Sequence, residues 1–180
     1  VGMPRRRIGA AAARRRAYVT WIYSTSPEKL QAAVRTLRRT AMLSDTTIVF
    51  SAAGVHRPAE FAKDHVPAFA VGREPLDWLV VYPFTRTHEW YLLEPQKRAT
   101  MLREHGMLGK EFPMVLANTT ASFSLNDWEW MLALESPELV HLVDMMRHLR
   151  NSETRLYVRE ETPFYTGRRI TVEEVAEVLG

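Results

Sequence analysis

The spacing of apolar residues predicts a regular succession of strands and helices in the second half of the chain. Alternating or continuous apolar positions favour strands at 77–84, 115–125, 128–134 and 154–159. Helical spacing follows Pro95 as far as about His105, where Gly106 is expected to end the helix, and follows Ser136-Pro137-Glu138 again. The order from 77 to 160 is therefore β-α-β-β-α-β, the ferredoxin-like pattern in which helices cover one face of an antiparallel sheet.

The first third of the chain shows only part of the same pattern. Alternation predicts strands at 18–23 and 46–52, and Ser26-Pro27-Glu28 between them has the residues that begin a helix. The apolar stripe of that helix is expected to be buried and comprises Leu30, Ala33, Val34 and Leu37. Because the Ser-Pro-Glu start recurs at 136–138, residues 18–52 resemble the back half of a second copy of the unit.

These patterns predict an α+β fold of two ferredoxin-like halves, of the dimeric α+β barrel type, with antiparallel sheets, helices on one face and an incomplete first half. The expected divisions are a basic tail at 1–17, a partial first half with a long loop at 18–76, a complete second half at 77–170 and a C-terminal helix at 171–180. A loop as long as the one before residue 77 is usually functional.

Composition narrows the chemistry. The 180 residues include no cysteine, which excludes disulfides, Cys-ligated zinc, iron–sulfur clusters and a cysteine nucleophile. Any metal must therefore be held by His or carboxylates. The longest apolar runs have five residues, far short of the ~20 that span a bilayer, so no membrane span is expected. The HExxH, GxGxxG, Walker A and CxxC motifs are all missing from the sequence, which removes their support for peptidase, dinucleotide and P-loop functions.

The net charge of +3 is unevenly distributed. Residues 1–40 hold ten Lys or Arg and one acid, whereas residues 41–180 hold fourteen and twenty. The two Arg triplets at 5–7 and 14–16 are typical of a solvated tail, and a transit-like segment or a nucleic-acid arm are the alternatives. The tail is the commonest of these, so a nucleic-acid partner is not expected.

Six histidines are candidate ligands or bases: His56, His65, His88, His105, His141 and His148. His105 is expected in the last helical turn, where the helix dipole favours imidazolium. A metal ligand must be neutral, so a ligand role would need an acceptor on the second ring nitrogen. Taken one by one, the candidates have ordinary alternatives: His65 as a turn cap, Tyr82 and Trp90 as core aromatics, and Arg86 as a surface cation.

A series of motifs favours functional roles for these residues over the ordinary alternatives. They are 56–61 (HRPAEF), 65–69 (HVPAF), 81–86 (VYPFTR), 89–91 (EWY), 95–98 (PQKR), 104–106 (EHG), 129–130 (EW) and 158–169 (VREETPFYTGRR). In this order and spacing the chain from about 18 to 169 resembles the chlorite dismutase superfamily and, within it, the actinobacterial coproheme decarboxylases. The resemblance also implies further N-terminal strands that this sequence does not hold, as in an N-terminally truncated member.

The resemblance implies a role for each matching residue. His105 matches the proximal ligand of the haem iron. Tyr82 matches the tyrosine whose radical abstracts hydrogen from a propionate, and Trp90 matches a tryptophan that assists at the second propionate. His65 matches the distal base that deprotonates hydrogen peroxide, for which an unperturbed imidazole pKa of ~6.5 is suitable.

Two further positions complete the implied site. Arg86 matches a cation near the reacting propionate, where a guanidinium can bind a carboxylate. Asn118, in the strand segment 117–119, matches the distal side of the cofactor pocket. Chlorite dismutase activity itself is disfavoured, because it relies on a distal Arg that this strand does not contain.

The implied function is hydrogen-peroxide-dependent decarboxylation of iron-coproporphyrin III (coproheme) to haem b, the last step of haem synthesis by this route. A haem-binding protein without turnover, or with weak peroxidase activity, is the alternative. The resemblance also implies a cytoplasmic homopentamer and a transient contact with the iron-inserting chelatase.

Overall fold

The computed structural model describes residues 17–44, 46–58 and 66–179. The chain divides into two compact units, Val1–Asp45 with Ile170–Gly180, and Thr46–Arg169. No helix in the described part combines the length and apolar character needed to cross a lipid bilayer. His65 and the Arg triplets lie outside the described residues, so the roles suggested for them stay predictions.

The larger unit contains an antiparallel sheet built around one central strand. Its strands are β1 (Trp78–Arg86), β2 (Leu116–Ala121), β3 (Trp130–Ser136), β4 (Val158–Glu160) and β5 (Tyr165–Arg168). The strand order is β2-β3-β1-β4, and β5 also pairs with β1. With the helices between them, the elements follow the predicted β-α-β-β-α-β order, which confirms the ferredoxin-like arrangement of this region.

The second edge of β1 is shared by two short strands. β5 pairs with Trp78, Leu79, Val80 and Val81, and β4 pairs with Thr85 and Arg86. Residues 82–84 between them have no partner on this edge among the described residues. Pro83 lies in the middle of this gap. Because proline has no backbone N–H, this position of the central strand has no donor that a neighbouring strand would need to satisfy.

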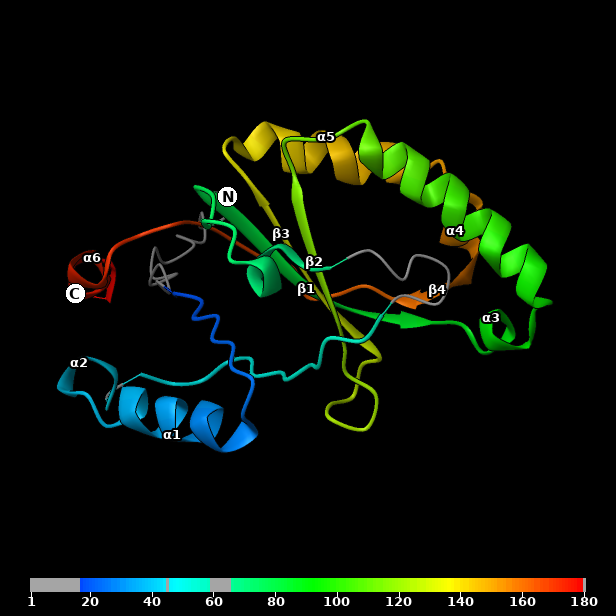
Figure 1. Ribbon diagram of the computed structural model, residues 1–180. Helices are drawn as coiled ribbons and strands as arrows, with labels where there is room; N and C mark the ends of the chain where they lie inside the picture. The colour runs from blue at the N-terminus through cyan, green and yellow to red at the C-terminus, as the bar shows by residue number, and fades with distance from the viewer. Residues whose placement is uncertain (1–16, 45, 59–65, 180) are drawn as a thin grey trace, which may run out of the picture. The chain divides into compact units, whose positions relative to one another are not determined.

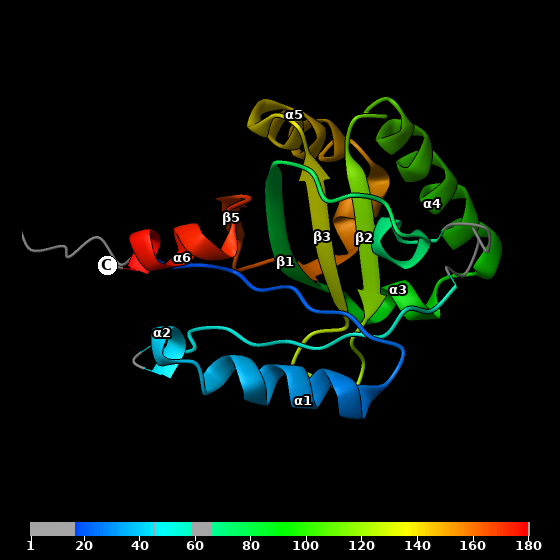
Figure 2. The same ribbon diagram turned by 60° about the vertical axis from the view of Figure 1, so that its left-hand side comes forward.

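Two long helices lie on the same side of the sheet, α4 (Pro95–Lys110) and α5 (Leu139–Leu149), as Figures 1 and 2 both show. Short helices accompany them: α3 (His88–Leu92) and the 3-10 helices η1 (Ala68–Val71) and η2 (Glu153–Tyr157). The core between sheet and helix is centred on Val80, Tyr82, Leu134 and Leu142. Burying each aliphatic side chain of this kind stabilises the fold by about 1.5–3 kcal/mol.

Several expected boundaries in this unit are wrong; the strand expected at 115–125, for example, ends at Ala121 as β2. Helix α4 continues through Gly106 to Lys110, because a glycine inside a helix costs only about 1 kcal/mol and packing outweighs that cost. Ser136 ends β3 instead of capping α5, whose N-cap is Glu138. The segment 154–159 is mostly the 3-10 helix η2, and only its end joins the sheet as β4.

The smaller unit is helical. It holds α1 (Pro27–Arg38), α2 (Ala41–Ser44) and α6 (Val172–Leu179), of which α6 confirms the expected C-terminal helix. Ser26 caps α1 as predicted, since its side chain accepts a hydrogen bond from the Lys29 N–H. However, α1 has no buried residue, so its apolar stripe does not form the expected core contact.

The strands expected at 18–23 and 46–52 are wrong. Both segments are described and neither forms a strand. An extended segment forms a strand only when its backbone groups pair with a neighbouring strand. The only such pairing among the described residues before 77 is an isolated antiparallel bridge between Val55 and Ala121. Alternating polar and apolar residues therefore predicted strands that these segments do not form.

Candidate functional site

The phenol of Tyr82 is enclosed on the helix side of β1. Its side chain is 5% exposed, and its ring stacks on Phe164 with centroids 4.7 Å apart. The hydroxyl donates to the Met146 Sδ at 3.7 Å, a weak thioether acceptor. Burial, and secondarily the negative charge of Glu161, raise the pKa of Tyr82 far above its ordinary value. Tyr82 is therefore a neutral phenol at physiological pH.

Arg86 provides a cation on the same strand, four residues beyond Tyr82. Its guanidinium carbon lies 4.1 Å from the centroid of the Trp90 ring and 4.6 Å from that of Phe84. Its Nη1 donates to the Thr154 carbonyl at 3.1 Å. Burial lowers the pKa of Arg86 to about 10, which still leaves it charged at neutral pH. In the described part of the chain, no carboxylate forms a salt bridge with this guanidinium.

The carboxylate of Glu129 acts on Arg86 but bonds other groups. Glu129 Oε2 accepts the backbone N–H of Arg86 at 2.8 Å and the hydroxyl of Tyr91 at 2.6 Å. Glu129 therefore fixes the main chain of Arg86 while its side-chain charge acts on the guanidinium only from a distance. The cation stays available for an external carboxylate.

Trp90 forms one wall of this region. It lies in the short helix α3 and is 4% exposed. Its ring packs against Tyr157 with centroids 5.6 Å apart, and Arg86 covers its face. The structure therefore brings Trp90 and Arg86 into direct contact.

His105 faces the same region from helix α4. Its Nδ1 lies 3.3 Å from the Thr154 Oγ1. Burial, and secondarily the positive charge of Arg86, lower the pKa of His105, while Glu161 opposes the shift. The helix runs five residues beyond His105, so the expected stabilisation of imidazolium by a helix end is wrong. The ring is neutral at neutral pH, the form that binds a metal.

Sequence reasoning missed a charged cluster beside these residues. Glu161 is 13% exposed, and its Oε2 is bound by both Arg150 and Arg155. Its charge acts on Tyr82, Arg86 and His105 alike. Glu161 lies in the motif at 158–169, but the sequence assigned it no role, because this role depends on contacts made in the fold.

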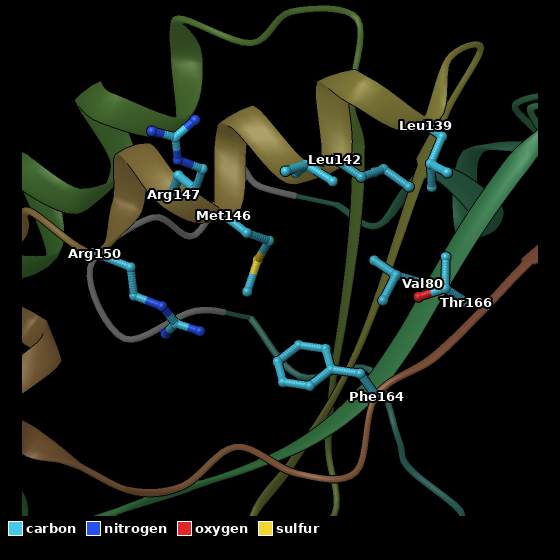
Figure 3. A pocket seen from close by; sticks show the side chains of 9 residues that line it. Val80, Leu139, Leu142, Met146, Arg147, Arg150, Phe164 and Thr166 are labelled. Carbon is cyan, nitrogen blue, oxygen red and sulfur yellow. The ribbon is translucent and has the colours of Figure 1, made fainter.

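A cavity of about 340 Å³ lies beside Tyr82, since Met146 and Phe164, which both contact Tyr82, line it. Its lining residues are Val80, Leu139, Leu142, Val143, Met146, Arg147, Arg150, Phe164 and Thr166. Figure 3 shows Arg150 extending from α5 toward Phe164, next to Met146. Because Arg150 also binds Glu161, the cavity adjoins the charged cluster as well.

Asn118 is not brought together with the other candidates. It pairs with Ala133 in the sheet, whereas Tyr82 pairs with Leu132, so the two side chains point to opposite faces. Asn118 is 1% exposed and bonded on all sides: to Glu135 Oε1 at 2.9 Å, to the Ala133 carbonyl and from the Phe69 N–H. Its neighbours Ala117 and Thr119 share the face of Tyr82.

The resulting site has four of the six candidates on one face: Tyr82, Arg86, Trp90 and His105. It combines a neutral imidazole, an un-ionised phenol and a cation that has no salt bridge to any described carboxylate. Such a set can ligate a metal through one nitrogen, bind a carboxylate and transfer a hydrogen atom.

Comparison with known proteins agrees with this chemistry. A family model described as chlorite dismutase matches residues 6–170. The chain is 47% identical over 163 residues to the coproheme decarboxylase of Mycolicibacterium smegmatis, which covers 90% of the chain and 71% of the relative. It is 26% identical over 108 residues to the coproheme decarboxylase of Thermus thermophilus, covering 57% of the chain and 43% of that relative.

Solved structures agree on the fold. The chlorite dismutase of Candidatus Nitrospira defluvii in complex with imidazole matches with a TM-score of 0.73 and 16% identity, over 86% of the chain and 68% of that protein. A haem-binding protein from Thermus thermophilus matches with a TM-score of 0.55 and 26% identity, over 59% of the chain and 46% of that protein. The expected α+β fold class is confirmed.

Proposed function

Because the chain belongs to the chlorite dismutase family, we propose that it catalyses the oxidative decarboxylation of coproheme to haem b, with hydrogen peroxide as the oxidant. The observation that carries the proposal is the convergence of His105, Tyr82 and Arg86 on one face of the sheet. Each vinyl group is made by a balanced reaction. One propionate and one peroxide give a vinyl group, carbon dioxide and two waters.

The residues present fit an iron porphyrin with reactive carboxylates. A neutral His105 with an oxygen at Nδ1 can use Nε2 as an iron ligand. The buried guanidinium of Arg86, which has no salt bridge in the described part of the chain, can receive a substrate carboxylate. When bound, the iron of the substrate reacts with peroxide and supplies the oxidising power.

Tyr82 supplies the hydrogen-abstracting group. A phenol held neutral by burial gives up its electron and proton together, and regains both when it takes a hydrogen atom from a propionate. Because Tyr82 and Arg86 lie on one strand, the cation that holds the carboxylate and the phenol that oxidises it have a fixed spacing. Trp90 closes the site beside Arg86 and assists at the second propionate.

Further parts of the proposal rest on the family resemblance. His65 is the base that takes a proton from peroxide. The protein assembles as a homopentamer, works in the cytoplasm and receives its substrate by transient contact with the chelatase that inserts iron. Asn118 is left out of the proposed site, because its side chain lies on the opposite face of the sheet.

The test is to add ferric coproheme to the purified protein, titrate hydrogen peroxide in stoichiometric steps and follow the products by mass spectrometry. Two successive losses of a carboxyl group that end at haem b are expected. Binding without mass loss would instead establish a haem-binding protein without turnover and overturn the proposed reaction.

The ligand assignment is tested with a matched pair of histidine variants. His105→Ala is expected to abolish the five-coordinate ferric spectrum of the complex. His88→Ala changes an exposed histidine in α3 and should leave that spectrum intact. An unchanged spectrum in His105→Ala would remove His105 as the ligand.

A further inference from the structure

His105 has a single described side-chain partner, and it lies at the ring nitrogen that a metal would not use. The Nδ1 atom is 3.3 Å from the hydroxyl of Thr154 in η2. Thr154 is 3% exposed, so water does not compete freely for its hydroxyl. The contact links α4 to η2, two elements that are 43 residues apart in sequence at their nearest ends.

The hydroxyl of Thr154 has a second neighbour that can take its proton. The Ser152 Oγ lies 2.9 Å from the Thr154 Oγ1 and is equally buried. A hydroxyl has one hydrogen to donate and lone pairs to accept with. If Thr154 donates to Ser152, its oxygen is free to accept the Nδ1–H of His105, and the lone pair of Nε2 then points to the site.

We propose that Thr154 is a positioning residue that holds His105 in its Nδ1–H tautomer, through the chain His105 Nδ1–H, Thr154 hydroxyl, Ser152 hydroxyl. The inference rests on the proposed function for the identity of the ligand, but the hydrogen bond itself is a property of the ligand-free protein. A hydroxyl is a neutral acceptor, weaker than a carboxylate, so His105 remains an ordinary imidazole with little imidazolate character.

Thr154 also positions Arg86, by a separate group. Its backbone carbonyl accepts the Arg86 Nη1 at 3.1 Å. One residue thus fixes the iron ligand through its side chain and the carboxylate-binding cation through its main chain. A change of side chain at 154 removes the first contact and spares the second, which makes the two roles experimentally separable.

The direct test is NMR of ligand-free protein labelled with ¹⁵N at histidine, recorded near neutral pH. His105 is expected to show a protonated Nδ1 and an unprotonated Nε2. Thr154→Val removes the hydroxyl at nearly constant shape and should shift His105 toward the Nε2–H form. Thr154→Ser restores the hydroxyl and should restore the tautomer. Wild-type protein with Nε2–H, or no change in Thr154→Val, would overturn the proposal.

A second readout uses ferrous haem b as the probe. Thr154→Val is expected to lower the iron–imidazole stretching frequency in resonance Raman spectra and to weaken haem binding roughly ten- to a hundredfold, while Thr154→Ser recovers both. Thr85→Val is the matched control, because the hydroxyl of Thr85 is buried without a partner in the described part of the chain. It should change neither measurement.

The two hypotheses fail separately. Absence of decarboxylation would reject the proposed function and leave the tautomer of His105 as measured. A protein that decarboxylates coproheme but shows the Nε2–H tautomer, or the same stretching frequency in Thr154→Val, would retain the function and reject the role of Thr154. Serine rescue distinguishes positioning from a general loss of packing.

Discussion

The two faces of the sheet in the larger unit differ in how completely their polar groups are bonded. On the helix side, Tyr82 has only a thioether partner and Arg86 has no bound carboxylate among the described residues. On the other side, Asn118 and Glu135 satisfy each other and hold the backbone of Phe69 and Leu76. Groups bonded within the fold stabilise it, and groups left for a ligand perform chemistry.

The difference between the two faces of the sheet is tested most strongly by a change at Tyr82. Tyr82→Phe keeps the ring and its stacking on Phe164 but removes the oxidisable hydroxyl. Coproheme should still bind, while the rate of vinyl formation should fall about a hundredfold or more. Single-turnover mass spectrometry measures the rate. Vinyl formation at the wild-type rate would remove Tyr82 from the mechanism.

Arg86→Met tests whether the cation on the helix side serves the substrate. Loss of a charge-assisted hydrogen bond should weaken coproheme binding about ten- to a hundredfold. Haem b lacks the reacting carboxylates and should bind nearly as well as to the wild type. Absorbance titrations with both porphyrins give the two dissociation constants. Equal weakening for both would show that Arg86 does not bind a reacting propionate.

Asn118→Leu tests the opposite face. The variant leaves Glu135 and the Phe69 N–H without their buried partner, so the free energy of unfolding should fall by about 1–3 kcal/mol. Urea denaturation measures this loss. The affinity of the folded protein for haem b should hardly change. A large loss of affinity with unchanged stability would place Asn118 in the ligand site after all.

The smallest effect concerns pH. Burial and Arg86 lower the pKa of His105 in the folded state, so the unfolded chain binds this proton more readily. The contribution of His105 to stability is therefore present above its ordinary pKa and is lost as pH falls below it. His105→Gln should make the free energy of unfolding less dependent on pH between about 7 and 5 than in the wild type. An equal pH dependence would contradict the lowered pKa.

Much of the larger unit could be predicted because local pattern and tertiary packing agree there. The central strand 77–84 and the helix after Ser136 appear close to their expected places. The resemblance implies that Tyr82 and Trp90 share one site, and both side chains are buried. The tetrapyrrole chemistry itself came from the resemblance, since spacing alone made His105 an ordinary histidine.

The remaining features depend on interactions that a linear pattern does not contain. The face of the sheet on which Asn118 lies depends on strand register, and a one-residue shift in register would place its side chain on the opposite face. The roles of Glu161 and Thr154 depend on contacts across 79 and 49 residues, to Tyr82 and His105. Residues 18–23 and 46–52 alternate as strands do, yet neither segment pairs with a strand in the part of the chain that the structure describes.

The gap on the second edge of β1 gives the reacting phenol an unusual support. Between β5 and β4, residues 82–84 form no ladder pair on that side, and Pro83 has no amide hydrogen. Moving β4 away from β5 therefore breaks no backbone hydrogen bond of this segment on that edge. The stack of Phe164 on Tyr82 spans this gap, while β4 and β5 are each held to β1 by ladder pairs on either side of it. At the phenol, this edge of the sheet is therefore closed by an aromatic contact instead of a backbone ladder, while β3 pairs the other edge throughout.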